Sequence, residues 1–478
     1  MIRNTAWFNV YWSPIALALV FAVYVLFVTH FRGELLGPES YSAGFDSLGE
    51  SLMKGECSVD PDIIGNEARI IRGKPTMYFG PFPSILRIVA SSLLSTQPGF
   101  LGRPSGLLAA SLSVLAFLGI MKRSLDRNRS TIPDTHGCFR FFSALGFALG
   151  TPILLLIASV SIYHETILWG LFWSLLGIWC LWAPRSDIAQ LTLFSLSCAG
   201  AVLSRLSFAL PLFIILAVMA IAEAWNFLKS VWHNPPHRLS GCGRLLAILL
   251  PASIAVAFQL WLNDCRYGDW TIFIHPIEWQ GKPIAQFGGF YNPIRIAIGV
   301  YNYFLLLPVW QNTFPFWSLS KVYYPTSAYF IPGYREWSVS LLATSPFMIS
   351  GAIMGFVSLM FRTRGRLFND AELPKHVSLA AVLFFAQGVL ILSCFFHTLR
   401  YASEFLPVFV TGFSIFLARV NLSISRASVR ILLVLSIWSI LATTWIVVSW
   451  HQMPENWMVS ASNKGYLMQL LGQNPDKR

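Results

Sequence analysis

The sequence predicts an all-α integral membrane protein, and composition and the spacing of apolar stretches lead to this class. Of its 478 residues, 55% are hydrophobic and only 12% are charged, about half the charged fraction of a soluble domain. The mean hydropathy is +0.59. Apolar runs of about 17 to 25 residues, each the length of one bilayer crossing, recur along the chain. We therefore expect one polytopic domain of about eleven transmembrane helices.

The eleven predicted spans follow from uninterrupted apolar runs. They are 13–29, 104–121, 141–160, 166–182, 189–204, 207–222, 245–262, 337–361, 378–396, 404–418 and 431–450. The first run is followed by His30, Phe31 and Arg32 instead of a small-residue cleavage site, so we expect an uncleaved anchor. The run 297–311 is shorter and contains Tyr and Asn, which favours a segment lying along the interface.

The charge pattern predicts the orientation of these spans. With a cytoplasmic N-terminus, half of the 34 Lys and Arg fall in inside segments that hold far fewer residues than the outside connections. This agrees with the positive-inside rule, whereas 16 of the 22 Asp and Glu fall outside. Acid chemistry is therefore expected on the extracytoplasmic side, together with the C-terminus.

Two of the predicted outer connections are much longer than the others. The transmembrane domain is expected to cover 1–450, with outer loops at 30–103 and 263–336 and a short outer tail at 451–478. Long loops in an otherwise tightly connected protein tend to carry function. We expect an amphipathic helix over 45–54, because Phe45, Leu48, Leu52 and Met53 have helical spacing.

Several function classes are disfavoured by what the chain lacks. The predicted spans have no ionisable residue at their centres, as an ion-coupled transporter usually has. The sequence contains no phosphate-binding GxxxxGK[ST], no HExxH and no GxSxG motif. The nine histidines and seven cysteines show no zinc-ligand spacing. Cys57 and Cys265 are both predicted to lie outside, where either a disulfide or two free thiols would fit.

The first outer loop concentrates charged residues that suit acid–base and phosphate chemistry. Acids such as Asp46, Glu50 and Glu67 come first, and Lys74 and Arg87 follow. Asp46 and Glu50, four residues apart, share one face of the expected helix. The alternative is that either acid simply lies on a solvated helix face.

The chain resembles GT-C-fold glycosyltransferases, the protein O-mannosyltransferase-like and aminoarabinose-transferase-like enzymes that take sugars from polyprenyl phosphate carriers. The matching motifs run through most of the chain in order. They are Phe45-Asp46 with Leu48 and Glu50, Lys54-Gly55-Glu56, Tyr78-Phe79-Gly80-Pro81-Phe82-Pro83, Tyr163-His164-Glu165 with Trp169-Gly170, Leu203-Ser204-Arg205, Asn263 with Arg266-Tyr267-Gly268, and Arg400-Tyr401 with Glu404 and Pro407. All fall outside or at outer span ends in the predicted topology.

The resemblance implies a glycosyltransferase that moves a monosaccharide from a polyprenyl phosphate to an acceptor hydroxyl at the outer face, by a direct, inverting displacement. It assigns Asp46 as the base, with Glu50, His164 and Glu165 as further candidates for catalysis. Cations expected at the donor phosphate are Lys74, Arg87, Arg205, Arg266 and Arg400, with Tyr401 beside them. Residues expected to line the substrate or lipid site are Glu67, Tyr78, Phe79, Asn263, Tyr267 and Glu404.

Several of these residues also fit purely structural roles. Arg205 and Arg400 could be snorkelling residues at span ends, and Glu165 could cap a helix N-terminus. A divalent cation is neither required nor excluded, and no other cofactor is indicated. Alternative functions are transport or flipping of a lipid-linked sugar, and a catalytically silent subunit that holds a lipid or another membrane protein. The absence of outer glycosylation sequons and the form of the motifs favour a bacterial plasma membrane.

Overall fold

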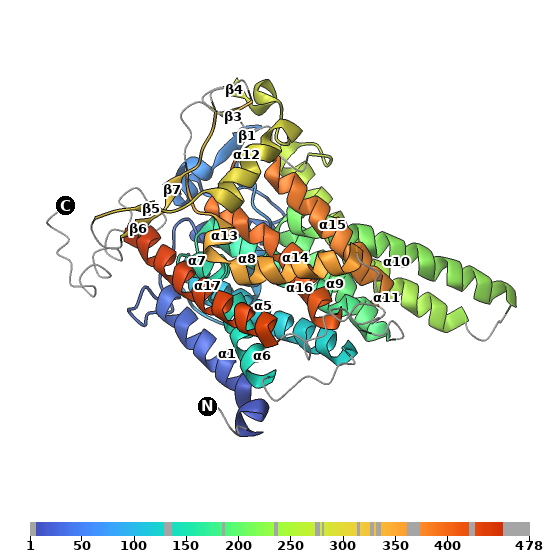
Figure 1. The fold of residues 1–478 in the computed structure, drawn as a ribbon. Coiled ribbons are helices and arrows are strands. Elements are labelled where there is room, and N and C mark those ends of the chain that lie inside the picture. Colours follow the sequence, from blue (N-terminus) through green and yellow to red (C-terminus); the bar gives the residue numbers. More distant parts are fainter. Residues whose placement is uncertain are drawn as a thin grey trace.

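The computed structural model describes most of the chain (Figure 1). The described residues are 6–128, 136–183, 187–233, 238–272, 278–279, 282–312, 316–325, 329–330, 336–360, 373–419 and 426–452. The predicted outer tail 451–478 lies outside them beyond Gln452. In this part of the chain the structure is mostly helical, with four small two-stranded antiparallel sheets.

The main helices follow the predicted spans. They are α1 (Ala6–Val28), α5 (Gly102–Arg127), α6 (His136–Ala148), α8 (Ile162–Leu181), α9 (Ile188–Ser204), α10 (Leu206–His233), α11 (Arg238–Tyr267), α14 (Pro346–Met360), α15 (Lys375–Leu392), α16 (Leu406–Arg419) and α17 (Arg426–Gln452). Among the described residues, seven helices are long and apolar enough to cross a membrane, and shorter apolar helices account for the other predicted spans. The all-α membrane class is thus confirmed.

Two predicted spans are not continuous helices. The run 337–361 begins with β8 (Trp337–Ser338) and then forms α13 (Leu341–Thr344) and α14, which Ser345 separates. The other span is broken where the sequence contains a glycine and a proline. The run 141–160 forms α6, which ends at Ala148, and the short α7 (Ile153–Ile157). Pro152 lies between the two helices and has no backbone N–H to continue the first one. At Gly150, an added Cβ would lie 2.7 Å from the Ser439 side chain, so α17 packs directly against this break.

Close helix packing in the core depends on small residues. An added Cβ at Gly355 of α14 would lie 1.8 Å from the Gly412 carbonyl oxygen of α16, so the two helices approach backbone to backbone. Aromatic rings fill the space beside this contact, with Phe117 of α5 stacked on Phe147 at 4.2 Å between ring centroids. The helices α8 and α16 are almost entirely surrounded by others.

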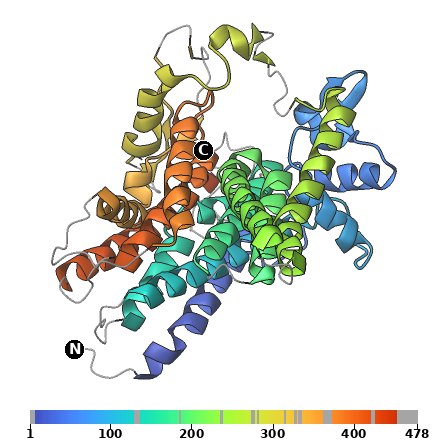
Figure 2. The ribbon, with the colours of Figure 1, turned by 90° about the vertical axis from the view of Figure 1, so that its right-hand side faces the viewer.

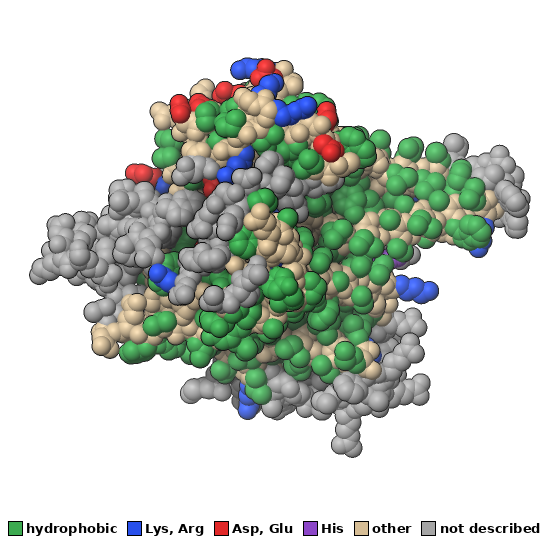
Figure 3. Space-filling model, turned by 90° about the horizontal axis from the view of Figure 1, so that it is seen from above, with side chains coloured by type: hydrophobic (Ala, Val, Ile, Leu, Met, Phe, Trp, Pro, Cys, Tyr) green, Lys and Arg blue, Asp and Glu red, His purple; other side chains and the backbone are tan. Residues whose placement is uncertain are grey.

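The helices α10 and α11 form a hairpin that projects from the bundle (Figure 1). Its apolar side chains remain exposed, for example Ile221, Trp225 and Ile254, each at least 60% exposed. Figure 3 shows hydrophobic side chains over this projecting part, while charged side chains gather along one edge of the molecule. This distribution suits a protein whose outer wall faces lipid.

The two long outer connections contain the short elements. The first holds α2 (Ala43–Met53), α3 (Pro61–Ile64), β1 (Arg69–Ile71), β2 (Lys74–Thr76) and α4 (Phe82–Ser91). The second and the segment after it hold β3 (Glu278–Trp279), β4 (Lys282–Pro283), α12 (Ile296–Val300), a π-helical turn (Tyr301–Leu305), β5 (Val309–Trp310), β6 (Trp317–Ser318), β7 (Ser320–Lys321), β8 (Trp337–Ser338) and α13 (Leu341–Thr344). A 3-10 helix, Leu399–Phe405, precedes α16.

The amphipathic helix predicted over 45–54 is present as α2. The first part of its apolar face is buried, with Phe45 and Leu48 fully inaccessible, whereas Met53 at its end is 61% exposed. The segment around 297–311 forms only α12, the π-helical turn and β5, and no helix long enough to cross a membrane.

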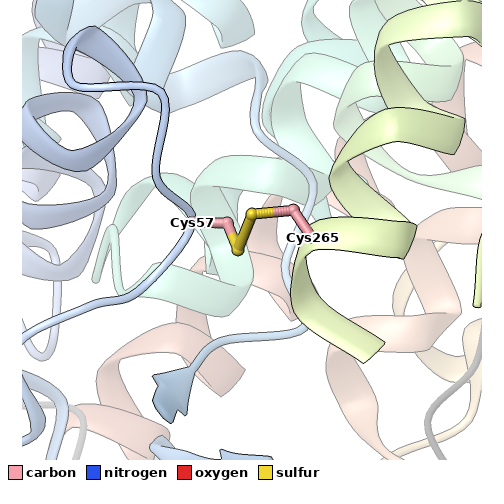
Figure 4. Close-up of a disulfide and its surroundings, with 2 residues drawn as sticks. All are labelled: Cys57 and Cys265. Atoms are coloured by element: carbon pink, nitrogen blue, oxygen red, sulfur yellow. A yellow bond between two sulfur atoms is a disulfide. The ribbon is translucent and has the colours of Figure 1, made fainter. Parts of the chain in front are cut away.

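A disulfide joins the two outer loops. Cys57, after α2, bonds to Cys265 near the end of α11, with the Cα atoms 6.1 Å apart (Figure 4). Figure 2 shows the first outer loop beside the outer end of α11, where this bond lies. The pairing that the sequence left open is therefore formed, across 208 residues of chain.

Candidate functional site

A cavity of about 610 Å³ lies where the first long loop, which is predicted to lie outside, meets the ends of several membrane helices. Its walls come from the first loop, the second long loop, α8, α9, α10, α11, α15 and the Leu399–Phe405 helix. Residues predicted for the site that line it are Glu67, Tyr78, Phe79, Arg205, Arg400, Tyr401 and Glu404. These side chains come from distant parts of the sequence, so the fold has gathered them.

Arg205 enters the cavity from the junction of two helices. It has extended backbone geometry between the end of α9 at Ser204 and the start of α10 at Leu206. Its guanidinium contacts Glu404 Oε1 at 2.6 Å and lies 4.8 Å from the ring centroid of Tyr401. The guanidinium is thus held by a carboxylate and an aromatic face, which fixes its position at the cavity wall.

Arg400 lies in the same cavity and has a similar environment. Its Nη2 donates to Glu336 Oε1 at 3.2 Å, and its guanidinium lies 4.4 Å from the Tyr163 ring centroid. It also lies 5.6 Å from the ring centroid of Tyr401, so both arginines are close to the same aromatic ring. Two planar cations close to one aromatic ring form an arrangement able to bind an anion, provided that the anion displaces their carboxylate partners.

The turn after β2 forms a further wall. The Tyr78 hydroxyl donates to Glu67 Oε2 at 3.0 Å, and its ring stacks on Phe79 at 4.3 Å. Burial and the neighbouring Glu67 carboxylate raise the pKa of Tyr78, so its hydroxyl stays protonated. At Gly80 an added Cβ would lie 2.1 Å from the Ser204 carbonyl oxygen, so only glycine allows this turn to press against the end of α9.

Asp46, Arg87 and Glu165 form a separate buried network. Arg87 Nη2 in α4 donates to both Glu165 oxygens at 2.9 and 2.8 Å, and its Nε lies 3.7 Å from Asp46 Oδ2. The Gly99 backbone N–H donates to the same Asp46 oxygen at 2.9 Å. Burial raises the pKa of Asp46 above its ordinary value, although the Arg87 charge and the Gly99 hydrogen bond act in the opposite direction.

This network lies beside the cavity and does not line it. The side chain of Asp46 is 16% exposed, whereas those of Arg87 and Glu165 are 3% and 0% exposed. Glu165 thus pairs with a cation inside the protein instead of acting as an exposed helix cap. The Nη2 group of Arg87 donates to the Glu165 carboxylate, and Arg87 is not among the residues that line the cavity.

The remaining predicted residues are dispersed around the cavity. Glu50 and Lys74 are exposed, and His164 is buried with its Nδ1 against the Ser159 carbonyl oxygen. Arg266 is 2% exposed and donates from Nη1 to the Phe79 carbonyl at 3.1 Å, with Tyr267 as its neighbour. The Asn263 side chain accepts from Gln259 at 2.8 Å. Arg266 and Asn263 therefore support the cavity from behind.

The structure places several side chains at the cavity that sequence reasoning did not single out. These are Arg69, Tyr163, Glu336, Tyr291 and Gln387. Tyr163 belonged to a recognised motif, and Arg69 lies in the charged first loop, so both carried a signal. Gln387 is one amide in an apolar run, and Glu336 lies outside every motif, so neither had a sequence signature.

A metal site is not evident in the described part of the chain. Among those residues, no three or more His, Cys, Asp or Glu side chains are grouped so that they could hold an ion. The carboxylates at the cavity pair instead with arginines or tyrosines, as Glu404 does with Arg205 and Glu67 with Tyr78.

Comparison with known proteins finds matches among solved structures only. No family model matches the chain, and no curated protein does. The chain is similar to the apo oligosaccharyltransferase of Archaeoglobus fulgidus (14% identity, TM-score 0.47), covering 98% of this chain and 60% of that one. It is also similar to ArnT from Cupriavidus metallidurans bound to undecaprenyl phosphate (13% identity, TM-score 0.45), covering 96% and 68%.

A third similar structure is the archaeal oligosaccharyltransferase AglB from Archaeoglobus fulgidus in complex with an inhibitory peptide and a dolichol-phosphate. Its identity is 12% and its TM-score 0.45, with coverage of 98% of this chain and 55% of that one. These similar structures are membrane glycosyltransferases of the GT-C fold, which is the class that the sequence motifs resemble.

Proposed function

We propose that the chain is a glycosyltransferase that moves a monosaccharide from a polyprenyl phosphate to an acceptor hydroxyl at the outer membrane face. The observation that supports this most directly is the composition of the cavity. Arg205 and Arg400 stand at the outer ends of membrane helices, and the apolar side chains of Leu206, Leu210 and Leu390 line the same cavity. A lipid phosphate needs this combination of cationic and apolar walls.

The phosphate of the donor would bind between Arg205 and Arg400. Each guanidinium is already oriented by an aromatic ring, so little side-chain entropy is lost when the anion takes the place of Glu404 and Glu336. The polyprenyl chain would leave past the three leucines, which are 40 to 45% exposed at the bundle surface. As the phosphate departs from the sugar, the arginines would stabilise the charge that develops on it.

The transfer itself needs a base. The acceptor oxygen forms a bond to the anomeric carbon, the bond from that carbon to the phosphate oxygen breaks, and the acceptor proton passes to a carboxylate. We propose Asp46 as this carboxylate, with inversion at the anomeric carbon. Because Asp46 does not line the cavity, this role requires the first outer loop to bring it closer when substrates bind.

Glu67 is a second candidate for the base because it lines the cavity directly. It accepts hydrogen bonds from the side chains of Tyr78 and Tyr163, which hold its carboxylate at the cavity wall. The two candidates make different predictions. Glu67→Gln should abolish transfer if Glu67 is the base, and should mainly weaken binding if Asp46 is.

The experiment is a transfer assay with the full chain in nanodiscs, using a panel of synthetic polyprenyl-phosphate monosaccharides and a mixture of envelope lipids and glycans as acceptors. We expect Asp46→Asn to lower turnover by about 100-fold or more while the donor still binds. Asp269→Asn is the matched control, because Asp269 is a loop acid outside the cavity. Its Oδ1 accepts a hydrogen bond from the Thr271 backbone N–H. Equal activity of wild type and Asp46→Asn would refute Asp46 as the base.

A transporter of lipid-linked sugars is the second candidate function. It would need the same phosphate site but no base, and the position of Asp46 outside the cavity is the observation in its favour. Movement of a labelled donor between leaflets in proteoliposomes, unchanged by Asp46→Asn and without sugar transfer, would support it. A protein that only holds a lipid would bind the donor and do neither.

A further inference from the structure

One face of α15 presents a regular stripe of side chains to the cavity. Gln387, Leu390 and Ile391 all line it, and their spacing of three and four residues places them on one side of the helix. Cys394, just beyond the end of α15, lines the cavity as well. Gln387 is the member farthest from the outer end, about 6 Å along the axis from Ile391. It is only 3% exposed, so its amide is buried in the wall of the cavity.

The amide of Gln387 has no protein partner. Within the described part of the chain, neither its oxygen nor its nitrogen makes a hydrogen bond. The same holds for Gln259 Oε1 on α11 and Ser207 Oγ on α10, and both residues line the same cavity. A buried polar group without a hydrogen-bond partner costs free energy. Unpaired groups on three residues around one cavity therefore indicate that a polar ligand forms hydrogen bonds with them.

The polyprenyl chain is a poor candidate for that ligand. Hydrocarbon offers no donor or acceptor, so an amide against it would stay unsatisfied. The bilayer-exposed side chains of the cavity, Leu206, Leu210 and Leu390, provide an apolar route for the tail, whereas Gln387 faces the interior. The part of a lipid-linked sugar that carries many hydrogen-bonding groups is the sugar.

We propose that Gln387 binds hydroxyls of the donor's sugar, an inference that rests on the proposed function. A carboxamide has one acceptor oxygen and a donor NH₂ side by side, which matches two adjacent hydroxyls. The donor is then a sugar with adjacent free hydroxyls on the side that faces α15. Gln387 acts as a specificity residue: it recognises the glycosylated lipid over the bare carrier, because the bare carrier leaves the amide unpaired.

The test compares two kinds of ligand on the full chain in nanodiscs. Dissociation constants are measured by native mass spectrometry for undecaprenyl phosphate and for the same lipid carrying a neutral hexose, a pentose or an amino sugar. In the wild type we expect at least one hydroxyl-rich glycolipid to bind about tenfold more tightly than the bare lipid. In Gln387→Met this preference should fall to about one, with affinity for the bare lipid changed less than about twofold.

Two controls separate recognition from a structural role. Gln190→Met changes an amide on α9 that donates to the Cys180 carbonyl and lies outside the cavity, so it should keep the preference for the glycolipid. The ligand-free Gln387→Met protein should be at least as stable to heat as the wild type, because the substitution removes an unsatisfied buried amide. A lower melting temperature would show that the amide supports the fold and would overturn the proposal.

The other outcomes are also decisive. If Gln387→Met weakens the bare lipid and the glycolipids equally, or leaves the preference intact, Gln387 does not recognise the sugar. If the wild type binds undecaprenyl phosphate but no glycolipid more tightly, the inference is wrong while the phosphate site stands. If the wild type binds no polyprenyl phosphate at all, the proposed function fails and the inference fails with it.

Discussion

Arg87 offers the most direct test of how the first outer loop is held. It is 3% exposed in α4 and donates to both oxygens of Glu165 at the start of α8, which is fully buried. Removing one partner of a buried pair leaves an uncompensated charge and typically costs about 3 to 5 kcal/mol. We therefore expect Arg87→Met to lower the free energy of unfolding by about that amount.

The double variant distinguishes loss of the pair from loss of packing. In Arg87→Met/Glu165→Gln the fully buried carboxylate charge is removed and only Asp46, which is 16% exposed, is left without its cation, so most of the lost stability should return. Lys74→Met is the matched control, since Lys74 is an exposed cation in the same loop and should change stability by less than about 0.5 kcal/mol.

Unfolding can be followed by tryptophan fluorescence as SDS is titrated into the protein in mild detergent micelles. The reasoning is refuted if Arg87→Met matches the wild type within about 1 kcal/mol. It is equally refuted if the double variant is no more stable than the single one, because the cost would then come from packing and not from an unpaired carboxylate.

Three further predictions follow from the site and the loops. Alkylating reagents should fail to label Cys57 and Cys265 in the native protein and should label both after reduction, as measured by peptide mass spectrometry; labelling before reduction would exclude the disulfide. Because burial raises the pKa of Asp46 and a base must be ionised, the transfer rate should fall on acidification at a pH above the ordinary Asp pKa of about 4. A transfer rate that does not change down to a pH of about 4 would contradict Asp46 as the base. Arg205→Met and Arg400→Met should each weaken undecaprenyl phosphate binding about 10- to 100-fold in a nanodisc binding assay, and unchanged affinity would place the phosphate elsewhere.

The membrane helices could be predicted because the bilayer imposes their length and composition. The apolar runs indicated the spans, and the spacing of Phe45 and Leu48 indicated α2, since both signals are local. The break at 149–152 was missed although Gly150 and Pro152 mark it, because the run looks continuous in hydropathy. Local signals of this kind predict single helices and do not predict which helices pack together.

Partners of the site residues could not be predicted because they lie far apart in the chain. Arg205 and Glu404 were both selected from motifs, but their pairing across 199 residues depends on how α9 and the segment before α16 meet. The Arg87 and Glu165 pair spans 78 residues for the same reason. Gln387 carried no signal at all, since its importance comes only from the absence of a partner among the described residues of the folded protein.

The central claim is that this protein uses a polyprenyl-phosphate-linked sugar, and one measurement tests it most directly. The protein would be purified with its native lipids, as wild type and as Asp46→Asn, and the bound lipids identified by mass spectrometry. We predict a polyprenyl phosphate in the wild type and its glycosylated form accumulating in Asp46→Asn, which would also identify the sugar. No polyprenyl species in either sample would contradict the claim.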